Sequence, residues 1–192
     1  MVRPADLKRE LFVVLLPDEN LEKAIKVLQR KLFEYLGLEQ KSDFPQLHIT
    51  IDRIKKERVT LASQVIKKQA ENFSQNIILK LDDLTCLQQI GSSYLVLKLK
   101  ATASLTDFAD QLHLKLRDEN ISSLENYNDW QFHITLINNH FIDHPISDFD
   151  FGKICELVDG FPQQEKGKAS KIEIWRPNLV KKEKIAFSKK LI

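Results

Sequence analysis

The chain has 192 residues, of which 43% are hydrophobic and 29% are charged, and its formal net charge at pH 7 is +2. These values are ordinary for a globular protein; they exclude a long disordered chain, and so mild a charge does not identify a nucleic-acid binder by its overall field. No stretch approaches eighteen uninterrupted apolar residues and the start holds no apolar signal-peptide core, so we expect a cytoplasmic protein with no membrane association.

The first half of the chain is predicted to alternate strands and helices. Residues 10–16, ELFVVLL, have the length and apolar content of a strand, and Asp18 is placed to cap a helix that ends at Gly37. The next segments have the periodicity of a strand, a helix and two further strands, in the order 47–53, 57–72, 76–86 and 93–100.

The second half is predicted to repeat this order. Thr102 or Ser104 can cap a helix over about 105–119. A strand, a helix, a polar loop and two strands follow, at about 131–137, 147–159, 161–170, 170–176 and 184–191, the last strand being extra to the repeat. We therefore expect one α+β domain, residues 1–192, made of two pseudo-symmetric lobes of about 1–90 and 91–192.

The two cysteines, Cys86 and Cys155, both lie in apolar contexts and have no CxxC spacing. This pattern favours buried, reduced thiols over a disulfide or a metal site. We expect no chemical role for either.

Two six-residue segments are nearly identical: QLHITI at 46–51 and QFHITL at 131–136. Side chains alternate between the faces of a strand, so the helices should cover the aliphatic positions, which are Leu47, Ile49 and Ile51 in one segment and Phe132, Ile134 and Leu136 in the other. The polar positions should project from the opposite face, with His48, Thr50 and Asp52 on one strand and His133 and Thr135 on the other. Each strand thus delivers an imidazole and a hydroxyl side by side.

Two imidazoles and two hydroxyls around one cavity can attack a phosphodiester without a metal. A neutral histidine takes a proton from water or a sugar hydroxyl, and a protonated one gives a proton to the departing oxygen. Threonine hydroxyls can donate to the non-bridging oxygens as negative charge develops on them. The sequence does not decide which histidine is the acid and which the base.

Other interpretations of the histidines are weaker. A single His-Ile-Thr strand is equally well explained by a satisfied, partly buried histidine, and only the repetition favours catalysis. Threonine is not a usual zinc ligand, His140 and His144 are interpreted as loop residues, and His113 as a helix-surface or boundary residue without a role. The sequence has no GxxxxGK[ST] loop and no GxGxxG after a strand, so we expect neither a cofactor nor a metal.

The segments LHITI at 47–51 and FHITL at 132–136 resemble the paired hydrophobic-His-x-Thr/Ser-hydrophobic signature of the two-histidine (2H) phosphoesterase superfamily. The approach DFPQLHIT, the strand pair at 76–100 and the closing segment SKIEIWRPNLVKKEKIAF are similar to its 2′-5′ RNA ligase-like branch. This resemblance implies a bilobal, duplicated α+β fold, with two sheets, helices on their outer faces and an active groove between the lobes.

The resemblance also implies roles for the repeated residues. His48 and His133 would be the general acid and base, and Thr50 and Thr135 would hold the phosphate. The expected function is a metal-independent phosphodiesterase that opens 2′,3′-cyclic phosphates at RNA ends or in nucleotides, with reversible 2′-5′ RNA ligation at the same site. The alternatives are a 2′-5′ oligonucleotide phosphodiesterase and a non-catalytic module that binds RNA ends or nucleotides. We expect a monomer.

One departure from the branch concerns the cation near the phosphate. RNA ligase-like members commonly carry a proline- and arginine-rich turn where this chain has QQIGSS, so Lys98 and Arg176 are the candidates to replace that cation. A base could stack on Tyr94 or Tyr127. For Phe44 and Trp130, core packing is the favoured interpretation.

Overall fold

The computed structural model describes residues 3–38, 46–89, 92–138, 146–158, 164–177 and 181–192. Within these residues the strands are β1 (Glu10–Pro17), β2 (Ile49–Lys55), β3 (Ile78–Gln89), β4 (Ser92–Leu99), β5 (His133–Asn138), β6 (Lys166–Trp175) and β7 (Ile185–Lys190). The α-helices are α1 (Glu19–Tyr35), α2 (Val59–Asn72), α3 (Ala103–Asp118), α4 (Asp148–Val158) and α5 (Lys181–Lys184), and two 3₁₀ turns are η1 (Lys56–Arg58) and η2 (Tyr127–Asp129).

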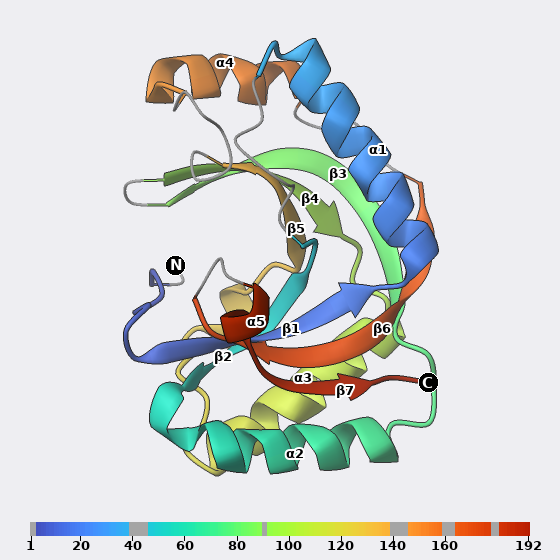
Figure 1. Ribbon diagram of the computed structural model, residues 1–192, viewed down its shortest axis with the longest axis vertical. Coiled ribbons are helices and arrows are strands. Elements are labelled where there is room, and N and C mark those ends of the chain that lie inside the picture. Colours follow the sequence, from blue (N-terminus) through green and yellow to red (C-terminus); the bar gives the residue numbers. More distant parts are fainter. Residues whose placement is uncertain (1–2, 39–45, 90–91, 139–145, 159–163, 178–180) are drawn as a thin grey trace.

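The strands form one antiparallel sheet in the order β2-β1-β6-β3-β4-β5, with β7 paired to β6. β3 and β6 pair only over Ile78, Leu79 and Lys80, so the sheet divides into a β2-β1-β6-β7 part and a β3-β4-β5 part. Figure 1 shows the strands curving into an open arc, with α2 and α3 outside the first part and α1 and α4 outside the second. The expected α+β class with helices on the outer faces is confirmed, and the two expected sheets are joined edge to edge through β3 and β6.

Each half of the chain supplies strands to both parts of the sheet. β1 and β2 pair with β6 and β7 in one part, and β3 pairs with β4 and β5 in the other. The strand β6 comes late in the sequence yet lies between β1 and β3. The interpretation as one domain with lobes of about 1–90 and 91–192 stays a prediction.

Side-chain caps explain where two long helices begin. Asp18 Oδ1 accepts a hydrogen bond from the Leu21 amide at 2.9 Å and caps α1, as predicted. Of the two predicted caps of α3, Thr102 is the one used. Ser104 instead accepts from the Ile78 amide at 2.9 Å and ties α3 to β3.

The strand β6 begins at Lys166, so the second half of the segment predicted as a polar loop over 161–170 is strand, while residues 161–163 lie outside the described residues. Exposed lysines in this stretch are typical of a loop. Its backbone is nevertheless part of the sheet, because Lys166, Gly167 and Lys168 pair with β3. Gly167 permits this path, because a Cβ there would lie 2.7 Å from the Leu21 Cβ in α1.

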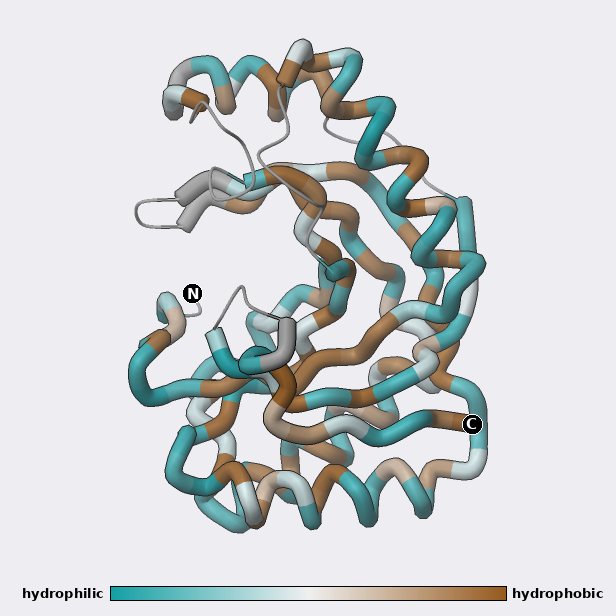
Figure 2. The backbone as a smooth tube through the Cα atoms, in the orientation of Figure 1, coloured by the Kyte–Doolittle hydropathy of each residue, from teal (hydrophilic) through white to brown (hydrophobic). Residues whose placement is uncertain are grey.

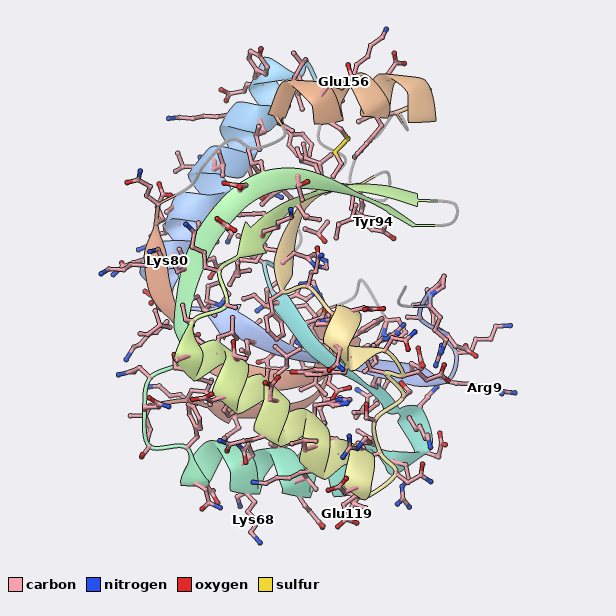
Figure 3. The ribbon with its side chains drawn as sticks, turned by 180° about the vertical axis from the view of Figure 1, so that it is seen from behind. Arg9, Lys68, Lys80, Tyr94, Glu119 and Glu156 are labelled. Carbon is pink, nitrogen blue, oxygen red and sulfur yellow. A yellow bond between two sulfur atoms is a disulfide. The ribbon has the colours of Figure 1, made fainter. Side chains whose placement is uncertain are left out.

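The two cysteines form a disulfide, and the expectation of reduced thiols is wrong. Cys86 in β3 and Cys155 in α4 have their Cα atoms 5.6 Å apart and their sulfurs bonded, which Figure 3 shows as the yellow bond beneath α4. Their apolar contexts correctly predict packing against the core, but partners 69 residues apart are chosen by the fold and not by local sequence. The expected cytoplasmic location stays a prediction.

The largest cluster of buried side chains lies between the sheet and the helices, and a smaller one lies on the inner, concave face of the arc. Figure 2 shows hydrophilic and hydrophobic positions alternating along α1 and α2, as expected of helices that cover a sheet. The smaller cluster contains Val14, Leu16 and Trp175. In the described part of the chain, no helix has the length and apolar character needed to span a bilayer.

Candidate active site

The strand β2 carries a β-bulge directly after its His-Ile-Thr motif. Thr50 pairs with Val14 and Asp52 pairs with the next residue, Val13, so Ile51 has no partner of its own. Val14 belongs to the concave cluster, which places Thr50 on the concave face. Val13 faces the helices, and Asp52 therefore does so too. The prediction that Asp52 projects together with His48 and Thr50 is wrong, because the bulge interrupts the alternation.

The strand β5 carries the same bulge at the same place in its motif. Thr135 pairs with Val96 and Ile137 pairs with Leu95, which leaves Leu136 without a partner. Leu136 and Ile137 are both in the helix-side core. In both motifs, the bulge therefore limits the concave face to the histidine and the threonine.

The histidine rings are held in the same way in the two motifs. His48 Nδ1 lies 3.1 Å from the Gln46 carbonyl oxygen, and His133 Nδ1 lies 2.8 Å from the Gln131 carbonyl oxygen. A carbonyl can only accept, so Nδ1 carries the hydrogen in both rings and Nε2 is left to take or give a proton. The repeated glutamine of QLHITI and QFHITL thus contributes its main chain to the site.

The two motifs approach each other although β2 and β5 stand at opposite ends of the strand order. The curvature of the sheet brings these end strands side by side (Figure 1). Trp130, just before β5, donates its indole N–H to the Thr50 carbonyl at 2.9 Å and is covered by the buried Arg53. The charge on His133 contributes to lowering the pKa of His48, so the imidazoles are near enough to interact.

His48 packs against Trp175 in β6, with ring centroids 4.5 Å apart. Burial is the main cause that lowers the pKa of His48 to about 4; the Gln46 carbonyl opposes this shift, and the positive charges of Lys184 and His133 add to it. His48 is therefore neutral at pH 7. Burial also lowers the pKa of His133, against the Gln131 carbonyl.

The sequence does not identify Lys184, which lies next to His48. Its Nζ is 3.4 Å from the centre of the Trp175 ring, and burial lowers its pKa to about 8, against the charge of Glu173. In the sequence, Lys184 belongs to a run of mixed charges that is typical of a solvated surface. Only the packing of α5 against β6 and β7 reveals its position.

Arg176 lies in the turn that holds this lysine. Its Nη1 donates to the carbonyls of Glu183 at 3.1 Å and Ile185 at 3.2 Å, and its amide donates to the Lys184 carbonyl at 2.7 Å. These contacts indicate that Arg176 stabilises the α5 segment.

Lys98 and Tyr94, two of the residues predicted to bind substrate, lie on the concave face of the sheet together with His133. Lys98 is the cross-strand partner of His133, and Tyr94 is paired with Asn138 further along β4. Figure 3 labels Tyr94 on β4, toward the β3–β4 hairpin. Both can reach a ligand on the concave face.

Tyr127 lies elsewhere, in a buried network behind β2. Its ring stacks on His113 with centroids 3.9 Å apart, and its hydroxyl donates to Asp110 at 2.9 Å. Burial and then Asp110 raise the pKa of Tyr127. His113 is only 6% exposed, and its Nδ1 lies 2.8 Å from Asp52 Oδ2, so its interpretation as a surface or boundary residue without a role is wrong. Ser122 also donates to Asp52, at 2.8 Å.

Phe44, His140 and His144 lie outside the described residues. Among the residues that are described, no three His, Cys, Asp or Glu side chains cluster as metal ligands would. Trp130 is half-buried and bonded to β2, in agreement with its packing interpretation.

Comparisons with known proteins agree with this architecture. Three solved structures cover 95% of the chain: TT0787 of Thermus thermophilus, at 15% identity, 97% coverage of that chain and a TM-score of 0.65; a phosphoesterase, at 13%, 98% and 0.55; and E. coli LigT complexed with 3′-AMP, at 13%, 97% and 0.53. At these identities the likeness establishes the fold alone. A sequence comparison with curated proteins gave no match. A family model described as the AKAP7 2′5′ RNA ligase-like domain matches residues 11–175, and the chain belongs to this family, within the 2H phosphoesterase superfamily.

Proposed function

We propose that the protein is a metal-independent phosphodiesterase that opens 2′,3′-cyclic phosphates at RNA ends or in nucleotides. The observation that carries the proposal is the matched pair of imidazoles on neighbouring strands, with a threonine beside each. In both, Nδ1 is held by a carbonyl and Nε2 is bonded to none of the described residues. Such a pair supplies one proton acceptor and one proton donor to a single phosphorus centre.

The reaction is a displacement at phosphorus. A neutral histidine takes a proton from water as its oxygen bonds to phosphorus, and the protonated histidine gives a proton to the ribose oxygen as its bond to phosphorus breaks, which leaves a 2′- or 3′-phosphate. Thr50 and Thr135 donate hydrogen bonds to the non-bridging oxygens, and Lys184 supplies positive charge. Because Lys184 disfavours a second positive charge beside it, we assign the base in ring opening to His48 and the acid to His133.

Two comparisons support a nucleotide or RNA end as the substrate. The matching family is described as 2′5′ RNA ligase-like, and the related fold of E. coli LigT was solved with 3′-AMP. Ligation would be the reverse reaction, with an RNA hydroxyl in place of water. A monomeric state and a cytoplasmic location remain predictions.

The test is hydrolysis of 2′,3′-cyclic nucleotides and of oligonucleotides ending in a cyclic phosphate, with a chelator present. His48→Ala and His133→Ala should each lower kcat/KM by about 10² to 10⁴-fold, the loss expected when a general acid or base is removed. Thr50→Val should also lower it, whereas Thr60→Val on the exposed face of α2 is a matched control that should not. Thermal melting confirms that each variant is folded. The proposal fails if no substrate shows turnover that depends on both histidines.

The family description favours one second candidate, cleavage or formation of 2′-5′ linkages. Incubation with 2′-5′ and 3′-5′ linked dinucleotides, followed by product analysis, separates this activity from ring opening. Tight binding without turnover, unchanged by either histidine substitution, would instead indicate a non-catalytic binding module.

A further inference from the structure

Residues 121–130, called the strap below, connect the two motif strands outside the ladders of the sheet. Among the described residues, no ladder pairs β2 with β5, which stand at the two ends of the strand order. The strap lies between α3 and β5 in the chain, and an isolated antiparallel bridge joins Ser122 in the strap to Ile54 in β2. The strap therefore follows β2 before the chain enters β5.

Main-chain hydrogen bonds hold the start of the strap to β2. The Lys55 amide donates to the Ile121 carbonyl at 3.0 Å, and the Ser123 amide donates to the Arg53 carbonyl at 2.8 Å. Both bonds join consecutive parts of the strap to the half of β2 that follows its bulge. This end of the strap is thus fixed to the first motif strand.

The other end of the strap leads directly into the second motif. Two residues after the strap, the Phe132 carbonyl accepts from the Leu99 amide of β4 at 3.0 Å, next to the β4–β5 ladder. Trp130, the last residue of the strap, donates its indole N–H to the Thr50 carbonyl at 2.9 Å. This single bond joins the residue that precedes the second motif to the threonine of the first.

The Trp130 ring is also held by Arg53 of β2. The guanidinium carbon lies 5.6 Å from the centre of the ring, within the range of a cation–π interaction. Arg53 is only 2% exposed; its Nη1 donates to the Arg3 carbonyl at 2.9 Å and lies 3.7 Å from Glu10. Its Nε and Nη2 have no hydrogen-bond partner among the described residues. Because a buried cation is costly unless it is compensated, the aromatic face stabilises the guanidinium, and the two groups hold each other in place.

We propose that Trp130 is a positioning residue that sets the placement of His133 relative to His48. Its indole bond fixes the start of the second motif against the main chain of Thr50, whose side chain holds the phosphate in the proposed function. The inference rests on that function and deepens it, because the acid and the base must meet at one phosphorus centre. A misplacement of about 1 Å can lower the rate of such a reaction about a hundredfold. Trp130 acts through Thr50 and needs no contact with the substrate.

The first test is Trp130→Phe, which keeps an aromatic ring beside Arg53 but removes the donor to Thr50. Its kcat/KM for a 2′,3′-cyclic nucleotide should fall by about tenfold or more. The matched control is Phe73→Leu, which loses ring packing against Phe108, with centroids 5.0 Å apart, at the end of α2. The control should keep kcat/KM within about twofold of the wild type, and thermal melting compares the stability of the two variants.

Inorganic phosphate tests the inference without turnover. A phosphate ion between the motifs contacts both of them, so Trp130→Phe should weaken its affinity by about fivefold or more in an NMR titration, whereas Phe73→Leu should not. The coupling is reciprocal, so phosphate should slow the exchange of the Trp130 indole hydrogen in the wild-type protein by a similar factor. The Phe73 amide, which donates to the Gln69 carbonyl at 3.1 Å, should exchange at an unchanged rate. The exchange measurement needs no variant to fold.

The outcomes separate this inference from the proposed function. If Trp130→Phe keeps the wild-type kcat/KM and phosphate affinity, or if Phe73→Leu shows the same losses, the positioning role is overturned and the phosphodiesterase is left intact. If the wild-type protein shows no turnover, the proposed function is overturned, and the phosphate measurements still decide the positioning role. A wild-type protein that neither turns over the substrate nor binds phosphate overturns both.

Discussion

The two motif strands differ on the face that packs against the helices. The first residue after the bulge is Asp52 in β2, whereas the equivalent residue in β5 is Ile137. The Asp52 carboxylate accepts from Ser122 and from the Arg53 amide and contacts His113. Ile137 simply packs in the apolar core. The concave faces of the two motifs are thus nearly identical, while the layers that support them have different chemistry.

The bulges themselves are also stabilised differently. The Leu136 carbonyl, at the bulge of β5, accepts from Gln29 Nε2 of α1 at 2.7 Å, and Gln29 is fully buried. On the β2 side, Asp52 accepts from the main chain next to its own bulge at 2.6 Å. The two motifs therefore share their geometry on the concave face, where the proposed site lies, and each interior can satisfy the bulge in its own way.

The largest expected effect concerns the covalent support behind β3 and β4, which β2 lacks. Reducing the Cys86–Cys155 bond, or replacing both cysteines by alanine, should lower the free energy of unfolding by about 3–4 kcal/mol, because a cross-link of 69 residues strongly restricts the unfolded chain. Urea unfolding with and without reductant measures this loss. The double alanine variant is the control, since reductant should not change its midpoint; an equal midpoint for the reduced and oxidised wild-type protein would contradict the prediction.

The next largest loss of stability is expected in the buried network of Asp52, His113 and Ser122 behind β2. Asp52→Ala should cost about 3 kcal/mol, because it leaves the buried His113 and the half-buried Ser122 without their acceptor. Asp52→Ile combined with His113→Leu and Ser122→Ala makes this layer resemble that behind β5, and it should be more stable than Asp52→Ile alone. Denaturant titration tests both statements. An Asp52→Ala protein within about 0.5 kcal/mol of the wild type would show that the network contributes little.

A smaller loss is expected at the bulge of β5. Gln29→Leu fills similar space but leaves the Leu136 carbonyl buried without a donor, which should cost about 2 kcal/mol. Gln64→Leu on the exposed side of α2 is the control and should change the stability by less than about 0.5 kcal/mol. Equal unfolding midpoints for the two variants would show that Gln29 does not stabilise the bulge of β5.

The smallest effect is a dependence of stability on pH that comes from His48. Its pKa in the folded protein is about 4, below the ordinary 6.5, so between these values the unfolded chain binds a proton that the folded protein does not. Stability should therefore fall as the pH falls through this range, by about 1–2 kcal/mol at pH 5. His48→Asn should reduce this loss when unfolding is measured at pH 7 and pH 5, and Lys184→Gln should reduce it partly. If His48→Asn lost as much stability between pH 7 and pH 5 as the wild type, other titrating groups would be responsible for the pH dependence.

The sequence predicted what local periodicity controls. The strand β1, the caps at Asp18 and Thr102 and the burial of Ile49 and Ile134 follow from patterns within a few residues. The orientation of Asp52 did not, because a bulge depends on the register against a partner strand.

The other features that the sequence did not predict depend on contacts between distant segments. The burial of His113 needs Asp52, the Cys86–Cys155 bond needs α4 to lie on β3, and the position of Lys184 needs Trp175. Of the proposed site, the sequence therefore identified the two motifs, and the fold was needed to identify the residues around them.

The central place of β6 has a consequence for the order in which the protein can be made. During synthesis β1 and β3 emerge before β6, the strand that pairs with both and ends at Trp175. Each therefore has an unpaired edge until β6 has been translated. A ribosome-bound chain that stops before β6 should accordingly be sensitive to proteases and retained by chaperones. The complete sheet, and with it the meeting of the two histidine strands, can form only after β6 has been translated.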